Sequence, residues 1–571
     1  MTAAAGDDAL VQALAGSAFF GGLEPHVLAR LLRDAERRSL RGGALLFRAG
    51  EAARSMGYVV AGCLGVFAGP EATGPLLGRI GAGETVGEMG LLSGRPRSAT
   101  VVALRDTELL EFSRASFERL IDTHPRALLE LARILIRRLE RRETAERDAV
   151  PRTLALLPLE GAAAGEAAER LAAALAPLGP THVVAPEERG RPAGWFSELE
   201  RRHRFVLYPG DPAAPGWDLF CARQADLELW VGGLEAGRWR VPVPPAPWRP
   251  RWLALLAERI PRGLGARGRA LGAERVLPVA AAGGWARLAR LVARRGVGIV
   301  FSGGGARGFA HVGMLQALAE AGIEADAVGG SSIGAVVAAG VACGWSLAEI
   351  TARFRDAFVR SNPLGDYTVP FVALTRGRRV SERLRAHFGG VDVEDLDLPF
   401  YAVATRLGAG SARVFAEGPL WLALRASTAI PGLLPPVFHE GEVLVDGGVA
   451  DNLPVAPMRA LAPGRIVGLE VAGDFRLRSS WDETELPPLP RMVLEWFRGR
   501  RRHDIARILL RAGMVNSEAA LAAARERLDL HLRPPLDGLD LLAWRDLDRI
   551  VEAGYRYASE RLRGMRLSLA S

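Results

Sequence analysis

The sequence predicts a multidomain protein with an N-terminal β-barrel carrying helices, a middle α/β layer and a C-terminal α/β domain. At 571 residues the chain is too long for one ordinary hydrophobic core. Its 49% hydrophobic and 24% charged residues are typical of a folded globular protein. The pattern of strand-like and helix-like segments changes along the chain, and we place the domains at residues 15–145, 151–284 and 285–571.

Short apolar segments separated by glycine turns fill the first region, and a long helical stretch ends it. Ala44–Phe47 and Gly57–Val60 are examples of the strand-like segments. In Ser116–Glu143 apolar residues recur at helical spacing, and arginines gather near its end. The region therefore predicts a small β-barrel closed by helices and followed by a solvated basic helix.

In the middle region, strand-like runs alternate with helical segments such as Ala164–Ala176, which is typical of parallel βαβ units. The strand-like runs are Thr153–Leu157, His182–Ala185, Phe205–Tyr208 and Leu227–Val231. No phosphate-binding glycine loop accompanies them, so the sequence predicts a scaffolding layer and indicates no further role for it. The Pro- and Trp-rich segment Val241–Trp252 interrupts regular structure and predicts a linker or docking segment.

The C-terminal region opens with two strand-loop-helix units in tandem. Gly296–Phe301 is typical of a buried strand, a glycine-rich loop follows it, and Phe309–Ala321 has helical spacing. Ala325–Val341 repeats the order of strand, loop and helix. Two such units predict an α/β sheet.

The composition excludes two enzyme classes. All 73 basic residues are arginine, so the lysine of a P-loop and the lysine of a Schiff-base enzyme are both missing. The net charge of +8 favours anionic partners, either nucleic acid or an acidic membrane surface. Cys63, Cys221 and Cys343 lie in three different regions without metal-ligand spacing, which predicts buried free thiols in a reducing compartment.

The N-terminus and the apolar runs favour a cytoplasmic protein. Asp7 and Asp8 stand where a signal peptide carries positive charge, and no apolar run reaches the roughly 18 residues of a spanning helix. Membrane contact is therefore expected to be peripheral, on the inner face of the membrane. One segment, Leu494–Arg502, sets apolar aromatics beside four arginines and suits an anionic lipid interface, although core packing beside a solvated charge run fits it nearly as well.

Five residues of the second strand-loop-helix unit have the spacing G-x-S-x-G. In Gly330–Gly334 the serine is Ser332, and this spacing is typical of a nucleophile elbow, a sharp turn between a strand and a helix. Glycines flank the turn because larger side chains would obstruct its close approach to neighbouring backbone. Since small residues cluster in many buried turns, this spacing predicts catalysis only together with other catalytic motifs.

Two further motifs supply a candidate oxyanion loop and a candidate base. The first is a glycine loop between a strand and a helix, made of Gly303, Gly304, Gly305 and Gly308. Its backbone N–H groups would stabilise a developing oxyanion. The second is Asp446, which follows the strand-like run Glu442–Val445 and precedes two glycines. Apolar neighbours would desolvate its carboxylate, which an aspartate needs in order to act as a base for Ser332.

These three motifs, in this order, resemble the patatin-like phospholipase family over roughly residues 290 to 571. Within that family the sequence is most similar to bacterial relatives of neuropathy target esterase, through Arg425–Pro436, Val445–Pro454 and Asp529–Leu536. The resemblance implies a patatin-like hydrolase fold and a carboxylic ester hydrolase that uses a Ser332–Asp446 dyad. It implies fatty acid release from phospholipid or lysophospholipid esters, without a metal or cofactor for catalysis.

Histidine is dispensable in this interpretation. The nearby candidates for the third member of a triad are His311, His387 and His439. His311 falls on the helix after the glycine loop and His439 follows a proline-rich loop, so structural roles are expected for both. A calcium site around Asp446–Asn452 is rejected because the spacing departs from that of an EF-hand.

Near the N-terminus, Val86–Val101 resembles the phosphate-binding cassette of cyclic-nucleotide-binding domains. The candidate contacts are Gly87, Glu88, Arg97 and Ser98. The resemblance implies that Glu88 holds the ribose 2′-OH and Arg97 the cyclic phosphate, roles that suit a carboxylate and a guanidinium. Ser98 is compatible with cyclic AMP and does not exclude cyclic GMP, and either nucleotide would be an allosteric ligand. Val86 and Gly90 depart from the common Phe and Ala, and the alternative is a barrel that has lost its ligand.

Other functions were weighed against a lipid hydrolase. The glycine loop also fits a dinucleotide fingerprint with Glu324 or Asp326 as the ribose-binding acid, but the second strand runs directly into the Gly330–Gly334 elbow. A cyclic-nucleotide-responsive transcription factor would place a helix-turn-helix after the sensor, where an α/β region follows instead. We therefore expect no nucleic-acid partner. The remaining alternative is a cyclic-nucleotide-responsive regulator or binding protein whose hydrolase domain is inactive.

Overall fold

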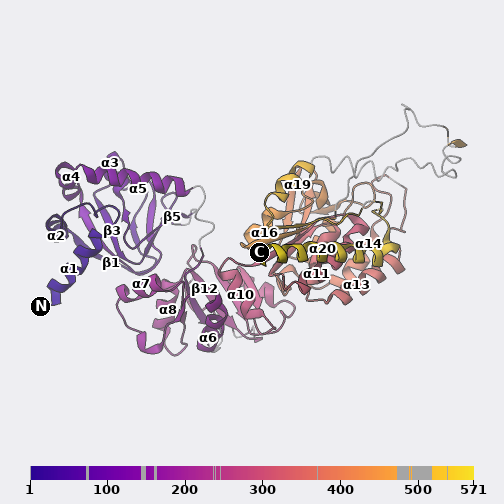
Figure 1. Ribbon diagram of the computed structural model, residues 1–571, viewed down its shortest axis with the longest axis horizontal. Coiled ribbons are helices and arrows are strands. Elements are labelled where there is room, and N and C mark those ends of the chain that lie inside the picture. The colour runs from indigo at the N-terminus through magenta and orange to yellow at the C-terminus, as the bar shows by residue number, and fades with distance from the viewer. Residues whose placement is uncertain are drawn as a thin grey trace. The chain divides into compact units, whose positions relative to one another are not determined.

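The computed structural model describes residues 2–570 apart from several gaps. The undescribed residues in this range are 73–75, 143–149, 160–163, 236, 238, 245, 370, 472–487, 489, 492–516, 537 and 540. The candidate lipid contact Leu494–Arg502 therefore lies outside the described residues. The chain divides into two compact units (Figure 1). The first has residues 1–257, 271–274 and 282–293, and the second has residues 258–270, 275–281 and 294–571.

The first unit begins with a β-barrel made of two antiparallel sheets of four strands, in the orders β1-β8-β3-β6 and β2-β7-β4-β5. The strands are β1 (Glu36–Leu40), β2 (Leu45–Phe47), β3 (Ser55–Ala61), β4 (Cys63–Phe67), β5 (Leu76–Gly81), β6 (Thr85–Val86), β7 (Thr100–Ala103) and β8 (Thr107–Ser113). Helices α1 (Thr2–Ala15), α2 (Pro25–Asp34) and α3 (Glu88–Ser93) accompany them. Leu14, Phe20 and Phe112 belong to the apolar core that the helices and strands share. The predicted barrel with helices is confirmed.

The helical stretch predicted over Ser116–Glu143 is divided between two helices. Helix α4 (Arg114–Thr123) ends before His124, and α5 (Arg126–Arg142) begins after Pro125. Proline has no backbone N–H to donate, its ring clashes with the preceding turn of a helix, and the residue before it avoids helical geometry. Pro125 is the physical reason for the break inside the predicted helical stretch.

The rest of the first unit is a parallel sheet with helices, as the alternating pattern predicts. Its strands run in the order β10-β11-β9-β12-β13. They are β9 (Thr153–Pro158), β10 (Thr181–Val183), β11 (Phe205–Pro209), β12 (Leu227–Gly232) and β13 (Arg251–Leu255), and the helices of this layer are α6 (Ala164–Leu175), α7 (Ala193–Arg202), α8 (Pro215–Gln224) and α10 (Gly284–Val292). Strand β13 begins inside the segment predicted as a linker, because Trp252 and the residues after it are buried beside β12.

The second unit is built on an eight-stranded sheet with the order β19-β20-β17-β16-β15-β21-β22, and β18 pairs with β17. The strands are β15 (Val297–Phe301), β16 (Ala327–Ser331), β17 (Phe400–Arg406), β18 (Ser411–Phe415), β19 (Val437–His439), β20 (Glu442–Asp446), β21 (Arg465–Leu469) and β22 (Leu530–Leu532). The centre of the sheet is parallel, and β20 joins β17 in the antiparallel sense. Because β15 and β16 are parallel neighbours, the loops after them lie at the same edge.

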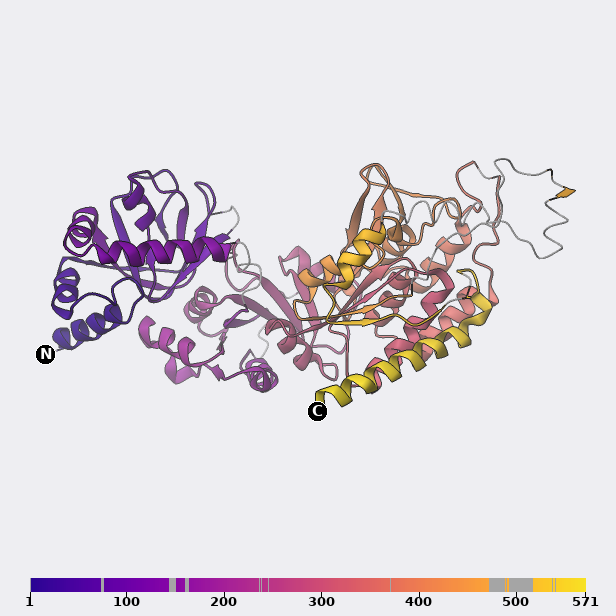
Figure 2. The ribbon, with the colours of Figure 1, turned by 45° about the horizontal axis from the view of Figure 1, so that its top comes forward.

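Helices cover this sheet. They include α11 (Ala310–Glu320), α12 (Ile333–Ala342), α13 (Leu347–Phe354), α14 (Arg378–Phe388), α15 (Leu420–Ser427), α16 (Val455–Leu461), α19 (Ser517–Arg525) and α20 (Leu547–Ala570). The long helix α20 lies along α11 in both ribbon views (Figure 2). A Cβ on Gly313 would lie 2.0 Å from the carbonyl oxygen of Val551, and one on Gly554 would lie 2.3 Å from that of Ala310. Only glycine at these positions allows so close an approach.

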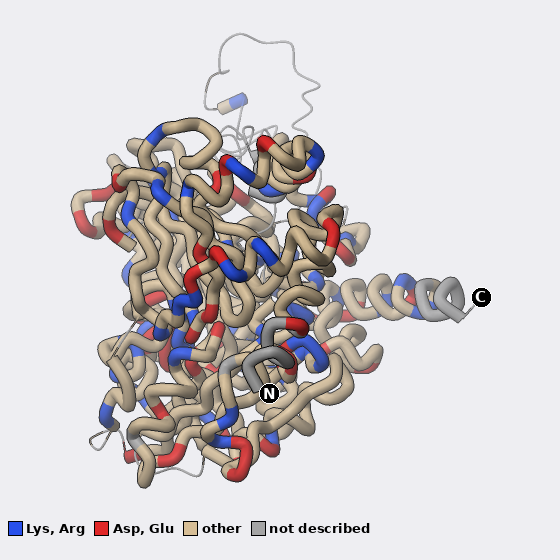
Figure 3. The backbone as a smooth tube through the Cα atoms, turned by 90° about the vertical axis from the view of Figure 1, so that its left-hand side faces the viewer, with Lys and Arg blue, Asp and Glu red and all other residues tan. Residues whose placement is uncertain are grey.

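Acidic and basic residues are interspersed along the backbone tube of Figure 3. Among the described helices, none combines the length and the apolar character that crossing a bilayer requires. The predicted multidomain class is confirmed, since the described residues form a barrel with helices, a parallel α/β layer and an α/β sheet domain. The exact domain limits stay predictions, and α10, which spans the predicted boundary between residues 284 and 285, contacts α6 of the first unit.

Candidate active site

The elbow predicted around Ser332 is a turn between β16 and α12. Ser332 has φ +54° and ψ −130°, a backbone conformation that costs most side chains about 1–3 kcal/mol. A Cβ on Gly330 would lie 2.4 Å from the carbonyl oxygen of Phe301, and one on Gly334 would lie 2.5 Å from that of Ser302. Glycines are therefore required because the elbow packs directly against the end of β15.

Ser332 and Asp446 come together although they are 114 residues apart in the sequence. The hydroxyl of Ser332 donates a hydrogen bond of 2.6 Å to Asp446 Oδ2, and the amide of Gly448 donates one of 2.8 Å to Oδ1. Sheet register explains the meeting: Ser331 pairs with Val403 on β17, and the next residue of that strand pairs with Asp446. Both side chains of the pair are buried.

The environment of Asp446 makes its carboxylate more basic than usual. Burial raises its pKa to about 6, against smaller opposing effects of the hydrogen bonds from Ser332 and Gly448. A carboxylate removed from water is harder to ionise, and a hydrogen bond to its charged form only partly restores that cost. The site therefore couples a buried hydroxyl to a carboxylate that accepts a proton near neutral pH.

Two hydroxyl side chains that the sequence interpretation missed hold the dyad in place. Ser427 Oγ accepts the amide of Ser332 at 2.9 Å and donates to the carbonyl oxygen of Val403 at 2.6 Å. Thr405 Oγ1 donates to the backbone oxygen of Asp446 at 2.8 Å. Ser427 lies in the stretch Arg425–Pro436, which resembles the family. The role of Ser427 nevertheless depends on backbone contacts that sequence spacing does not predict.

The four glycines of the predicted oxyanion loop do not lie in equivalent places. The amide of Gly303 is engaged by the backbone and side-chain oxygens of Asn452, at 3.3 and 3.2 Å. Gly308 lies under Ile333, where a Cβ would be 2.4 Å from the side chain. Gly304 and Gly305 stand between them at the start of a short 3₁₀ helix, and no acceptor is found for their amides within the described part of the chain.

None of the three histidines weighed for a triad bonds to Ser332 or Asp446 in the described residues. His311 is fully buried and its Nε2 lies 2.9 Å from the carbonyl oxygen of Ser302, and burial lowers its pKa to about 4. His387 contacts Arg353, and His439 faces Glu440. The acid proposed for a dinucleotide site, Asp326, is buried and accepts the amide of Val297 at 2.9 Å, so it links β16 to β15.

Three of the candidate nucleotide contacts, Gly87, Glu88 and Arg97, lie close together, and Ser98, which follows Arg97, is exposed. The guanidinium of Arg97 donates 2.7 Å hydrogen bonds to the carbonyl oxygens of Gly87 and Ser55 and lies over the ring of Phe47. Burial lowers the pKa of Arg97. Gly87 has φ +84°, and a Cβ there would lie 2.5 Å from the Arg97 guanidinium.

Glu88 has a partner from helix α5. Its buried carboxylate accepts a 2.7 Å hydrogen bond from Arg138, whose other nitrogen donates to the carbonyl oxygen of Thr85 at 2.7 Å. Arg138 was expected on a solvated basic face, and that expectation is wrong because the helix crosses the cassette and the arginine neutralises the buried acid. The side chain assigned to the ribose hydroxyl is thus already paired with a cation.

Two family models match the chain. The patatin-like phospholipase model matches residues 299–459 and the cyclic nucleotide-binding domain model matches residues 37–124. Over 555 residues the chain is 30% identical to an uncharacterized NTE family protein of Mycobacterium bovis, and the match covers 93% of each chain. The chain belongs to the NTE family. It carries a patatin-like phospholipase domain and a cyclic nucleotide-binding domain, and it is a lipid ester hydrolase.

Other NTE family relatives are longer than this chain. A lysophospholipase of Emericella nidulans is 27% identical over 664 residues, which cover 95% of this chain and 43% of that protein. Among solved structures, the catabolite activator protein of Thermus thermophilus is 30% identical with a TM-score of 0.21, over 28% of this chain and 70% of that one. The expected resemblance to bacterial relatives of neuropathy target esterase is confirmed.

Proposed function

We propose that this chain releases fatty acid from phospholipid or lysophospholipid esters, with Ser332 as the nucleophile and Asp446 as its base. The observation that carries the proposal is the 2.6 Å hydrogen bond from Ser332 Oγ to Asp446 Oδ2 at a strained elbow. The raised pKa of Asp446 supports it, because a carboxylate with a pKa nearer neutrality takes a hydroxyl proton more readily.

In the proposed reaction Ser332 Oγ attacks the carbonyl carbon of the ester while its proton moves to Asp446 Oδ2. The carbonyl π electrons become the charge of an oxyanion, which the amides of Gly304 and Gly305 would hold, since those of the flanking glycines are engaged or packed away. Collapse of this intermediate breaks the ester bond, and the leaving alcohol takes the proton from Asp446. Water then attacks the acyl-serine with Asp446 again as base, which frees the fatty acid and restores the Ser332 hydroxyl.

Free fatty acid release from a panel of phospholipids, lysophospholipids and acylglycerols tests this proposal. The similarity to a lysophospholipase is a reason to include lysophospholipids of several head groups. We expect release from a phospholipid or lysophospholipid by the natural chain and none by Ser332→Ala. Failure of the natural chain to release fatty acid from every member of the panel would overturn the proposal.

We also propose that the barrel binds cyclic AMP or cyclic GMP and that binding changes the rate of hydrolysis. The hydrogen bond from Arg97 to Gly87, the residue before Glu88, favours this because it brings the three candidate contacts together. A nucleotide would have to replace Arg138 at Glu88 and two backbone carbonyls at Arg97, so its binding would release helix α5 from the cassette. A ligand changes activity only if it binds two states of the protein with different affinity.

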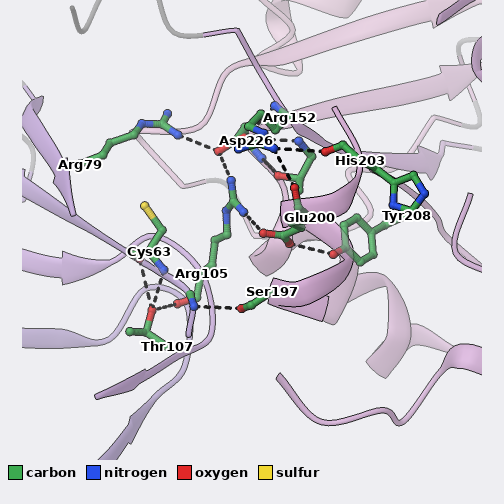
Figure 4. A network of polar contacts seen from close by, with 12 residues as sticks. Cys63, Arg79, Arg105, Thr107, Arg152, Ser197, Glu200, His203, Tyr208 and Asp226 are labelled. Carbon is green, nitrogen blue, oxygen red and sulfur yellow. Dashed lines mark hydrogen bonds and ion pairs between the residues drawn. The ribbon is translucent and has the colours of Figure 1, made fainter. Parts of the chain in front are cut away.

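A network of ion pairs joins the barrel to the α/β layer within the first unit (Figure 4). Arg105, on the turn between β7 and β8, donates to Asp226 at 2.7 Å and pairs with Glu200 of α7. Arg79 of β5 donates to the same oxygen of Asp226 at 2.7 Å. Asp226 Oδ2 in turn accepts the amide of Arg152 at 3.0 Å, at the start of β9. In the proposal this network passes a change in the barrel to the α/β layer.

A further inference from the structure

A hairpin between α13 and α14 presents an apolar tip to solvent. Its arms are joined by a β-bridge between Tyr367 and Thr375, and by a 3.0 Å hydrogen bond from the amide of Thr368 to the carbonyl oxygen of Leu374. The amide of Arg376 closes the base by donating to the carbonyl oxygen of Asp366 at 2.9 Å. Pro370, within the tip, lies outside the described residues. The rest of the hairpin has the internal bonds of a formed element.

The side chains at this tip are large, apolar and exposed. Phe371 is 91% exposed, Tyr367 is 69% exposed, and Val369 and Val372 are each 65% exposed. Single exposed apolar residues are common on soluble proteins, whereas four within six consecutive positions mark a surface that binds something. A partner with an apolar phase would remove these side chains from water.

The base of the hairpin is fixed to the chain segment that positions the dyad. The amides of Leu374 and Thr375 donate to the carbonyl oxygens of Gly432 and Leu433, at 2.8 and 3.2 Å. A few residues earlier the same segment holds both members of the dyad. Ser427 accepts the amide of Ser332 at 2.9 Å, and the carbonyl oxygen of Ala429 accepts the amide of Asp446 at 2.9 Å.

A buried arginine packs against the residue that follows the hairpin. Arg425 donates from one terminal nitrogen to the carbonyl oxygen of Pro435 at 2.9 Å and from Nε to the hydroxyl of Ser381 at 3.2 Å. Gly377, at the end of the hairpin, packs so closely that a Cβ there would lie 2.8 Å from the guanidinium. Because the base of the hairpin is bonded to the segment that holds the dyad, whatever the tip binds is brought to a fixed position relative to the dyad.

Basic side chains follow the tip. Arg376, Arg378 and Arg379 are exposed, and the carboxylate of Asp366 accepts the backbone amide of Arg378 at 2.7 Å. Arg378 itself faces Glu382 in an exposed pair, which contributes little in water. Apolar and aromatic side chains beside arginines suit the boundary between acyl chains and anionic head groups.

We propose that this hairpin, of which the structure describes residues 366–369 and 371–376, docks the enzyme on a lipid bilayer that contains anionic lipid, with Phe371 and Val372 entering the acyl region and Arg376 meeting the head groups. The inference rests on the proposed lipid hydrolase function, because a bilayer is then the surface on which the substrate is found. Docking would place the segment that holds Ser332 and Asp446 beside the membrane, so that an ester passes from the bilayer to the dyad over a short path.

Sedimentation with vesicles tests docking apart from catalysis. The full chain carrying Ser332→Ala is mixed with vesicles of phosphatidylcholine alone or with phosphatidylglycerol added, and the bound fraction is measured. Adding Phe371→Ser and Val372→Ser should weaken binding at least tenfold, since both apolar side chains would otherwise leave water. Arg376→Ala should weaken binding to the anionic vesicles by about fivefold and change binding to phosphatidylcholine little. The matched control is Leu129→Ser, an exposed leucine of α5 that is 61% exposed.

Activity separates failure of this inference from failure of the proposed function. With Ser332 intact, the Phe371→Ser and Val372→Ser variant should hydrolyse a water-soluble short-chain ester at the natural rate and vesicle lipid at least tenfold more slowly. Loss of the natural chain's activity on both substrates would count against the proposed function. Natural vesicle binding by the hairpin variant, or binding lowered equally by Leu129→Ser, would overturn the docking role. So would a dimer of the natural chain that the hairpin variant abolishes while vesicle binding stays unchanged, because the tip would then serve a second copy of the chain.

Discussion

Asp446 in the second unit and Asp226 in the first are both largely buried, yet their pKa values shift in opposite directions. Burial raises the pKa of Asp446 to about 6, and hydrogen bonds from a hydroxyl and an amide offset only part of that effect. Burial acts on Asp226 in the same sense, but the guanidinium groups of Arg105 and Arg79 outweigh it and hold its pKa well below the ordinary value. The difference lies in the partners, since the described residues place no cation against Asp446.

The two aspartates have different roles: Asp446 is suited to act as a base, and Asp226 forms structural ion pairs. A buried carboxylate that faces only a hydroxyl and an amide keeps a high affinity for a proton, which a base requires. A buried carboxylate that faces arginines stays an anion, and its removal leaves a cation unpaired in the interior. The buried carboxylate of Glu88 likewise contacts a guanidinium, that of Arg138.

The largest effect should come from breaking the reactive pair. We expect Ser332→Ala to abolish fatty acid release, because it removes the nucleophile, and Asp446→Asn to lower the rate by about 10²- to 10⁴-fold, because it removes the general base. The measurement is release from the best lipid of the panel, with circular dichroism to verify the fold. Ser331→Ala is the matched control, as the neighbouring buried serine should affect the rate only modestly. An inactive Ser331 variant beside an active Ser332 variant would show that the elbow assignment is wrong by one residue.

The second effect is on stability and concerns Asp226, which is paired with Arg105 and Arg79. Arg105→Ala leaves Asp226 and Glu200 buried next to each other, and we expect the free energy of opening of the α/β layer to fall by about 3–5 kcal/mol. Hydrogen exchange of the amides of β9 and β12 in the full chain measures it. Glu166→Ala, which breaks an exposed pair with Arg170 on α6, is the control and should change it by at most about 0.5 kcal/mol. A loss for Arg105→Ala no larger than that of the control would contradict this reading of the network.

The sequence predicted the elements and motifs that are local, and it missed the contacts that are not. Ser332 and Asp446 could be proposed because each follows a strand and stands beside glycines, whereas their meeting across β17, which lies between β16 and β20, depends on the sheet order. Ser427 could not, since a serine that binds backbone has no characteristic spacing. Arg138 was assigned to a solvated face for the same reason: its pairing with Glu88 joins residues 50 positions apart and depends on how α5 crosses the barrel. Only the break at Pro125 could have been foreseen from one residue.

A smaller effect is expected on the affinity of the barrel for a cyclic nucleotide. We expect Arg97→Ala to weaken cyclic nucleotide binding by roughly 30-fold or more, because a buried charge-assisted contact is worth about 2 to 5 kcal/mol. Arg138→Ala should leave affinity equal or higher, since it frees Glu88 for the ribose. Calorimetry with cyclic AMP and cyclic GMP measures both. No heat from the natural chain would mean that the barrel has lost its ligand, and binding without a change in hydrolysis would mean that the sensor is uncoupled from the dyad.

The smallest effect, and the most direct test of the comparison, is the pH dependence of hydrolysis. A base acts only when ionised, so kcat/KM should rise with pH through the pKa of Asp446 in the free enzyme, which is about 6. At pH 5 a group with that pKa is ionised in roughly one molecule of eleven, so kcat/KM should fall about tenfold below its plateau. An aspartate with an ordinary pKa of about 3.9 would still be almost fully ionised at pH 5 and would show almost no loss.

Two other causes could produce a fall in kcat/KM at acid pH, the titration of Asp451 and unfolding, and each can be distinguished from the titration of Asp446. Asp451 lies five residues from Asp446 and burial also raises its pKa to about 6, but it does not bond to Ser332, so Asp451→Asn should keep the limb. Unfolding has the wrong sign. A raised pKa means that the folded state binds the proton more tightly, so both aspartates favour folding as the pH falls from 6 towards 4. Burial alone would raise the pKa of Glu470, but hydrogen bonds from His531 and Arg525 lower it to about 2. Glu470 therefore stabilises the fold above its unfolded pKa of about 4.3, and it loses that contribution only at lower pH. A limb centred near 4 would show that Asp446 is not the desolvated base that the comparison requires.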